Sequence, residues 1–260
     1  FAEAHSNLGG TLKELGKLEE AEASYRQAIV LKSNFSEAHI NLGNTLKELG
    51  RLEDADASYI QAIVLEPDNA VGHSNLAITL QELGRLDEAE ASCRQAIVLK
   101  PDYAEAHYNL GIILQELGRL EEAEVSYGQA IVLKPDSGFF KNRWALLFKK
   151  GDFEAALKDS KSCNTKKWRQ HNLETLYALG LKEEVYQRIE IESKENDENM
   201  RTASFASFLS KIEKKDTANN FCNNPIDFIH CSNISSHLSN STEFIGELIE
   251  ELYHLKTTWE

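Results

Sequence analysis

The residues best suited to bind a metal lie near the end of the chain. Ligand-type side chains gather there at Cys222, Asp227, His230, Cys231 and His237. Zinc knuckles and ribbons use cysteine pairs separated by about two to four residues. The two cysteines here are nine positions apart, which favours a structural segment over a metal site. We therefore expect neither a metal nor a cofactor.

The rest of the sequence contains no catalytic motif. It has no Gly-rich phosphate loop, no His-x-Glu or His-x-Asp pair and no nucleophile elbow. Histidine does recur every 34 residues, at His5, His39, His73 and His107. Side chains with this spacing fall in separate structural units and cannot share one metal, so we expect them to pack between helices. The sequence predicts no catalytic residue.

These histidines belong to a phrase that occurs four times. "EAHSNLGGTLKELG" begins at Glu3 and returns, with changes, at Glu37, Val71 and Glu105. Its apolar residues are spaced by three and four, which is the pattern of one helix face. A glycine follows each time, where a left-handed helix cap is expected, at Gly16, Gly50, Gly84 and Gly118. A second apolar stripe follows each glycine, so every repeat predicts a helical hairpin.

A single hairpin cannot bury both of its apolar stripes, but stacking on identical neighbours buries them. The sequence therefore predicts an all-α, right-handed α-solenoid. Asn34 with Glu37, and Asp102 with Glu105, have the spacing of capping boxes that would begin the next hairpins.

The repeat length, the Leu-Gly pair, the later Ala, Tyr and Ala, and the final Pro resemble the tetratricopeptide repeat family. The resemblance covers residues 2–136 and implies a helical scaffold that binds a peptide or helix of a partner protein in its concave groove. Cys93 takes the position that Tyr25, Tyr59 and Tyr127 fill in the other repeats, so we expect a buried residue and not a nucleophile.

The phrase "AHSNLG" also resembles the repeats of O-linked N-acetylglucosamine transferases. That resemblance implies a ladder of asparagines along the inner groove that holds peptide backbone. The matching residues are Asn7, Asn41, Asn75 and Asn109, with Asn142 in register in a degenerate repeat. The alternative is that these asparagines only brace neighbouring helices.

Other positions of the same helix vary between repeats while the packing positions stay nearly constant. The first two repeats offer Lys13 and Lys47, and the last two offer Ile78, Tyr108 and Ile112. These five residues, together with the asparagines, are the predicted partner-binding groove.

Beyond the four repeats of residues 1–136, the sequence predicts degenerate hairpins over 137–193 and a helical cap or linker over 194–260. An Asn/Ser-rich connector lies at 215–241. Residues 165–260 resemble the region before a 2-oxoglutarate/Fe(II) oxygenase domain in marine bacterial tetratricopeptide proteins. The iron-binding His-x-Asp of that family has no counterpart here, so any such activity would belong to residues outside this sequence.

The formal net charge is −14; residues 1–136 hold 11 basic and 23 acidic side chains, or −12. An acidic body disfavours nucleic acid as a partner. No apolar run reaches the roughly 18 residues of a membrane span, and the four cysteines lack a paired motif, which suits a reducing cytoplasm. We expect a non-catalytic scaffold. The alternatives are the substrate-recruiting part of a larger enzyme and self-association through the exposed N-terminal repeat.

Overall fold

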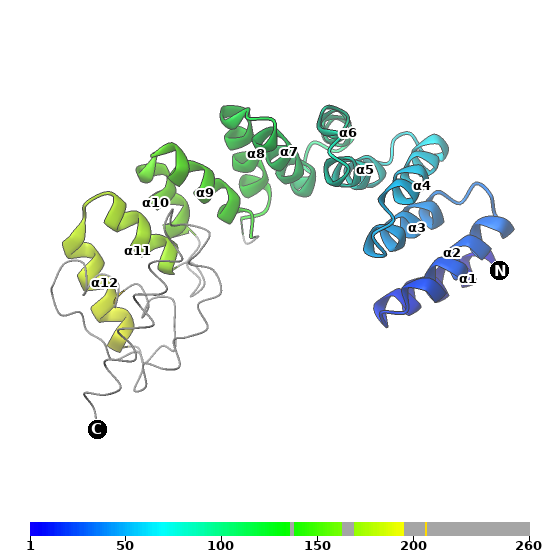
Figure 1. Ribbon diagram of the computed structural model, residues 1–260, viewed down its shortest axis with the longest axis horizontal. Coiled ribbons are helices and arrows are strands. Elements are labelled where there is room, and N and C mark those ends of the chain that lie inside the picture. Colours follow the sequence, from blue (N-terminus) through cyan, green and yellow to red (C-terminus); the bar gives the residue numbers. More distant parts are fainter. Residues whose placement is uncertain (136–137, 163–168, 195–205, 207–260) are drawn as a thin grey trace, which may run out of the picture. The chain divides into compact units, whose positions relative to one another are not determined.

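The computed structural model describes residues 1–135, 138–162, 169–194 and Ala206 (Figure 1). Regular structure in these ranges is helical, and none of their helices is long and apolar enough to cross a membrane. Internal contacts divide the chain into two units, 1–151 and 152–260. The predicted connector 215–241 lies outside the described residues, and so does the predicted segment 194–260 apart from Lys194 and Ala206.

Eight helices of the first unit form four hairpins, one for each repeat. The two helices of every hairpin pack against each other, and each hairpin packs on the next. The prediction of an all-α, right-handed solenoid is confirmed. The helices are α1 (Ala2–Glu14), α2 (Leu18–Leu31), α3 (Ser36–Glu48), α4 (Leu52–Leu65), α5 (Ala70–Glu82), α6 (Leu86–Leu99), α7 (Ala104–Glu116) and α8 (Leu120–Leu133).

The turn inside each hairpin is a left-handed glycine cap, as predicted. Gly84 has φ +76°, its amide donates to the Gln81 carbonyl at 2.9 Å, and the Arg85 amide donates to the Leu80 carbonyl at 2.8 Å. These two bonds form a Schellman motif, which satisfies carbonyls that the helix end leaves without partners. The other three hairpins repeat this geometry.

The capping boxes predicted at the starts of the second and fourth hairpins are wrong. α3 and α7 begin at Ser36 and Ala104, so the residues before them, Phe35 and Tyr103, take the N-cap position and make no side-chain cap bond. Each ring instead lies under a lysine, with Lys32 Nζ 4.6 Å from the Phe35 ring centre. Asn34 and Asp102 each precede the N-cap position by one residue, so their side chains do not cap the helices.

A tyrosine ring fills the space between the helices of three hairpins. A Cβ added at Gly43 would lie 2.6 Å from the Tyr59 ring, and the pairs Gly9–Tyr25 and Gly111–Tyr127 are equally close. The third hairpin has Ala77 and Cys93 at the two positions, both fully buried. A smaller side chain on one helix therefore accompanies a larger one on the other, and the expectation of a buried Cys93 is confirmed.

The first unit ends with α9 (Phe140–Lys150), whose C-terminal cap is Gly151 at φ +80°. The second unit contains α10 (Phe153–Ser162), α11 (Arg169–Ala178) and α12 (Lys182–Lys194), with Gly180 at the turn between the last two. Leu173, Leu176, Val185 and Ile189 form a small core there. The contact boundary falls after Gly151, inside the predicted segment 137–193, and that division of domains stays a prediction.

Replacing Gly84 by valine should destabilise the repeats by about 1 kcal/mol or more, because a β-branched residue strains at positive φ. Nothing lies within 4 Å of the added Cβ, so the cost would be backbone strain and not a clash. Urea unfolding measures it, with Gly84→Asn as the control, since asparagine tolerates this conformation better. Equal midpoints for the valine variant and the parent would contradict the cap.

Alkaline pH should weaken the repeats. Burial raises the pKa of the Cys93 thiol to about 12 and raises the pKa of Tyr25, Tyr59 and Tyr127 above 10. Folding thus favours the neutral thiol and the neutral tyrosine hydroxyls. Their contribution to the free energy of unfolding is complete below the pKa values of cysteine and tyrosine in the unfolded chain, about 8.5 and 10, and is lost as the pH rises above those values. Urea midpoints at several pH values measure the loss. A Tyr59→Phe, Tyr127→Phe variant with the parent's pH dependence would contradict this explanation.

Candidate functional site: the inner face of the repeats

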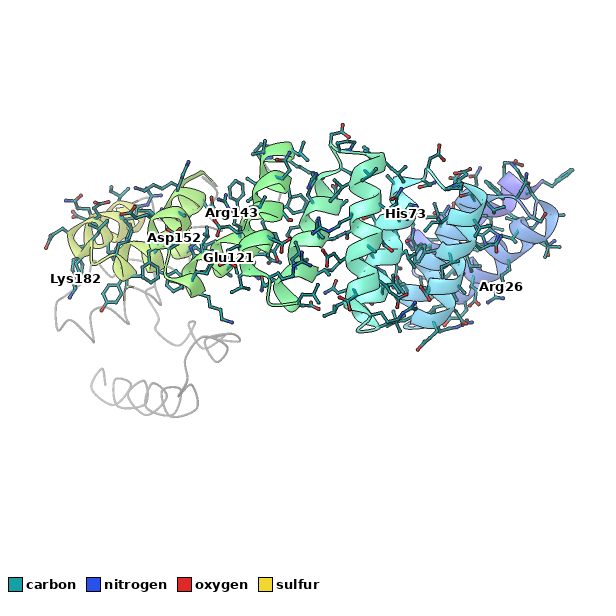
Figure 2. All side chains as sticks on the ribbon, turned by 90° about the horizontal axis from the view of Figure 1, so that it is seen from above. Arg26, His73, Glu121, Arg143, Asp152 and Lys182 are labelled. Atoms are coloured by element: carbon teal, nitrogen blue, oxygen red, sulfur yellow. The ribbon has the colours of Figure 1, made fainter. Side chains whose placement is uncertain are left out.

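The first helices of the hairpins form one continuous surface. α1 contacts α3, α3 contacts α5 and α5 contacts α7, whereas the second helices chiefly contact first helices. Helices on the concave side of a curved stack come closest together, so the first helices line that side. We call their surface the inner face and that of α2, α4, α6 and α8 the outer face. Figure 2 shows the described side chains, among them His73 of α5 and Glu121 of α8.

All predicted ladder asparagines of the four repeats lie on first helices, and Asn142 lies on α9. Asn7 is exposed, and the other four are half-buried. Two of those in the four repeats make hydrogen bonds to the preceding hairpin. Asn75 Nδ2 donates to Asn44 Oδ1 at 3.1 Å, and Asn109 Nδ2 donates to Ser74 Oγ at 3.3 Å. These two therefore brace neighbouring first helices, which leaves one N–H and the carbonyl oxygen of each amide for a ligand.

Asn44 is a residue whose role the sequence did not reveal. Its Oδ1 accepts from the Tyr59 hydroxyl at 2.7 Å as well as from Asn75. It thereby joins the second hairpin's tyrosine to the third hairpin. Asn41, by contrast, makes no side-chain hydrogen bond within the described part of the chain, so its amide is open to a ligand.

The predicted lysines are engaged by the following repeat. Lys13 Nζ lies 2.9 Å from Glu48 and Lys47 Nζ lies 4.0 Å from Glu82. In the third repeat a glutamine takes the lysine's place, and Gln81 Nε2 donates to Glu116 Oε1 at 2.6 Å. The glutamates recur every 34 residues, a signal in the sequence that the groove prediction did not use.

The apolar candidates gather toward the fourth repeat. Ile78, Tyr108 and Ile112 are each half-buried on α5 and α7. The Tyr108 ring stacks on Phe139 with centroids 4.4 Å apart and is tilted against Tyr127 at 5.7 Å. Such aromatic contacts fix the ring's orientation and leave part of its surface to a ligand.

The histidines serve the connections between hairpins. His73 Nε2 donates to the Pro67 carbonyl at 3.1 Å, and His107 Nε2 donates to the Pro101 carbonyl at 3.0 Å. Each ring thus ties a first helix to the turn before it. The described residues contain no group of three or more His, Cys, Asp or Glu side chains arranged to hold a metal, and the Cys222–His237 group lies outside them.

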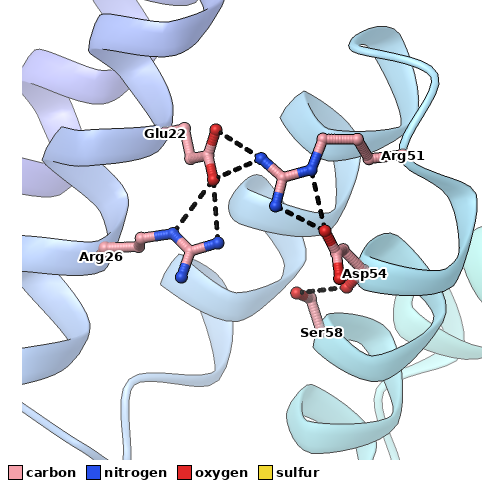
Figure 3. Close-up of polar contacts among 5 residues, drawn as sticks. All are labelled: Glu22, Arg26, Arg51, Asp54 and Ser58. Atoms are coloured by element: carbon pink, nitrogen blue, oxygen red, sulfur yellow. Dashed lines mark hydrogen bonds and ion pairs between the residues drawn. The ribbon is translucent and has the colours of Figure 1, made fainter.

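Ion pairs link successive hairpins on the outer face. Figure 3 shows Glu22 between two guanidinium groups, with Arg26 Nη2 and Arg51 Nη1 each 2.8 Å from Oε1. The pairs Arg85–Asp56 and Arg119–Glu90 repeat this contact at 2.9 and 2.6 Å. The basic residue follows the acidic one by 29 positions each time, so these contacts hold each hairpin in the same register on the one before.

Family comparisons identify the repeats. A model of the family described as "Tetratricopeptide repeat" matches residues 74–138, and one described as "TPR repeat" matches residues 9–50 and 43–84. Together the matches span residues 9–138. No curated protein sequence matches the chain significantly.

Solved structures share the fold at low sequence identity. PilF of Pseudomonas aeruginosa is 17% identical with TM-score 0.64, over 84% of this chain and 94% of its own. MamA of Desulfovibrio magneticus is 19% identical with TM-score 0.56, over 62% and 92%. YrrB, described as a TPR protein with an unusual peptide-binding site, is 22% identical with TM-score 0.53, over 70% and 92%.

The bracing asparagines should contribute to stability and the open one should not. We expect Asn75→Ala to unfold at lower urea than Asn41→Ala, by about 0.5–1.5 kcal/mol, the net value of one hydrogen bond. The two substitutions change helix propensity equally, so their difference reports the bond to Asn44. Equal midpoints would mean that this bond does not stabilise the stack.

Proposed function

Because this chain belongs to the tetratricopeptide repeat family over residues 9–138, we propose that its inner face binds an extended or helical segment of a partner protein. The chain is a repeat scaffold of a kind consistent with protein–protein interaction. The binding of a peptide in the groove is the specific proposal.

One observation carries the proposal. Tyr108 and Ile112 are apolar and half-buried, and they share one surface of α7 with Asn109. A partly exposed aromatic ring beside an amide suits a peptide, since the ring contacts a side chain while the amide pairs with backbone groups. Packing alone does not require these residues, because the first repeat has Ser6 and Gly10 at the same two positions.

The description of YrrB as a peptide-binding TPR protein adds support by analogy of fold. Asn7 and Asn41 of the predicted site also lie on the inner face, and their side-chain amides are available to a ligand. Lys13 and Lys47 are predicted groove residues, but their ammonium groups form ion pairs with Glu48 and Glu82 of the following hairpins.

Two alternatives use the same scaffold. Recruitment of substrates for an oxygenase domain would employ the inner face as well, and extending the reading frame beyond Glu260 to look for His-x-Asp would distinguish it. Self-association would use α1, where Leu8 is 48% exposed, whereas Leu42, Leu76 and Leu110 at the same repeat position are buried. A second copy covering Leu8 of α1 would leave the inner face of α3, α5 and α7 open.

The test is selection of peptides from a displayed library of random 12-residue sequences, followed by fluorescence anisotropy. Tyr108→Ala with Ile112→Ser should weaken binding by about 10- to 100-fold, since each apolar side chain contributes about 1.5–3 kcal/mol when fully buried. Val64→Ser with Val98→Ser is the control, because both valines are exposed on the outer face (66% and 72%). Equal effects of the two variants, or no peptide selected, would contradict the proposal.

A further inference from the structure

A row of glutamates ends the first helices. Glu14, Glu48, Glu82 and Glu116 are the last residues of α1, α3, α5 and α7. A carboxylate at this end of a helix faces unpaired carbonyls and the negative end of the helix dipole, which disfavours it. The acidic residues at the starts of the second helices are placed favourably by the same rule. The four glutamates therefore do not serve the stability of their own helices.

Compensation of this charge declines from the second hairpin to the fourth, and Glu14 of the first hairpin forms no ion pair in the described part of the chain. Glu48 has Lys13 at 2.9 Å, and Glu82 has Lys47 only at 4.0 Å. Glu116 accepts a hydrogen bond from the neutral amide of Gln81. Gln115, at the next position of this series, accepts from the Tyr127 hydroxyl at 3.1 Å. Within the described residues Glu116 forms no ion pair. A lysine precedes the glutamate in each of the first two hairpins and a glutamine precedes it in each of the last two, so the net negative charge of the row lies at the third and fourth hairpins.

The basic residue nearest in register does not neutralise it. Lys149 lies near the end of α9, 34 residues after Gln115, and it forms no ion pair with Glu116 in the described part of the chain. Two further acidic side chains, Glu105 and Glu121, bond lysines elsewhere and are not part of the row.

The apolar part of the inner face lies on the same two hairpins. Ile78, Tyr108 and Ile112 belong to α5 and α7, the helices that Glu82 and Glu116 end. The first two hairpins offer Gly10 and Asn44 at the positions of the two isoleucines. Acidic and apolar groups thus coincide on one half of the inner face.

We propose that the inner face of the third and fourth hairpins binds a basic, apolar peptide segment, in which lysines or arginines meet Glu82 and Glu116 and apolar side chains meet Tyr108 and Ile112. This inference rests on the proposed function and names the chemistry of its ligand. Charge complementarity steers such a segment to the face and orients it, and the apolar contacts hold it.

Three fluorescein-labelled 12-residue peptides test the inference by anisotropy: one alternates Lys and Leu, one Glu and Leu, and one Lys and Ser. The Lys-Leu peptide should bind the full chain at least tenfold more tightly than either of the others. Its affinity should fall as salt is raised from 50 to 300 mM, because the attraction is screened.

Glu82→Gln with Glu116→Gln should weaken the Lys-Leu peptide about tenfold or more. The control is Glu53→Gln with Asp87→Asn, which removes the same charge from exposed positions at the starts of α4 and α6. Because the glutamates sit at unfavourable helix ends, their removal should leave the urea midpoint equal or higher, so weaker binding would not reflect unfolding.

Two results would overturn the inference. Equal weakening by both double variants would mean a general attraction to the acidic body and not a site. Tighter binding of the Glu-Leu peptide, reduced by Tyr108→Ala with Ile112→Ser, would leave the proposed function standing and refute the basic ligand. If no designed or selected peptide binds, both proposals fail.

Discussion

The packing of a tyrosine ring on a glycine, inside three of the four hairpins of residues 1–135, is the contact on which the rest of the solenoid depends. The added Cβ distances of 2.6–2.8 Å at Gly9, Gly43 and Gly111 show that no side chain fits there while the ring is present. The ring sets how closely the two helices approach. The third hairpin has a similar arrangement with Ala77 and Cys93, both fully buried, so the packing of the hairpins is continuous across it. Hairpins of one shape can then stack with one offset.

That constant offset explains why contacts between repeats recur at fixed sequence separations. Arginines of the turns bond acidic residues 29 positions earlier, and inner-face contacts join residues 31 or 35 positions apart. Exposed ion pairs contribute little stability individually, so their main effect is to specify register. Asp56 meets Arg85 through one oxygen, and its buried Oδ1 has no hydrogen-bond partner. Ile60 stands where the first and third repeats have Arg26 and Arg94, which pair with the corresponding glutamates.

Periodicity predicted most of the fold of residues 1–135 because helix faces and glycine caps are local properties. It correctly predicted the turns at Gly84 and its equivalents and the burial of Cys93. It failed at the capping boxes of Asn34 and Asp102, which depend on the length of the connecting turn. It also did not reveal that Lys13 pairs with Glu48 or that Asn75 bonds Asn44, since both contacts cross between hairpins and depend on their offset. The predicted groove residues lie on first helices and on α9, and the groove and its binding role stay a proposal.

The two helices of each hairpin use acidic residues in opposite ways. The second helices begin with acidic pairs such as Glu121 and Glu122, where the helix dipole favours negative charge. The first helices end with glutamates, where the dipole opposes it, and the lysines that offset this charge in the first two repeats become glutamines in the last two. The change leaves net negative charge beside the apolar side chains of α5 and α7, and the proposed binding rests on that coincidence.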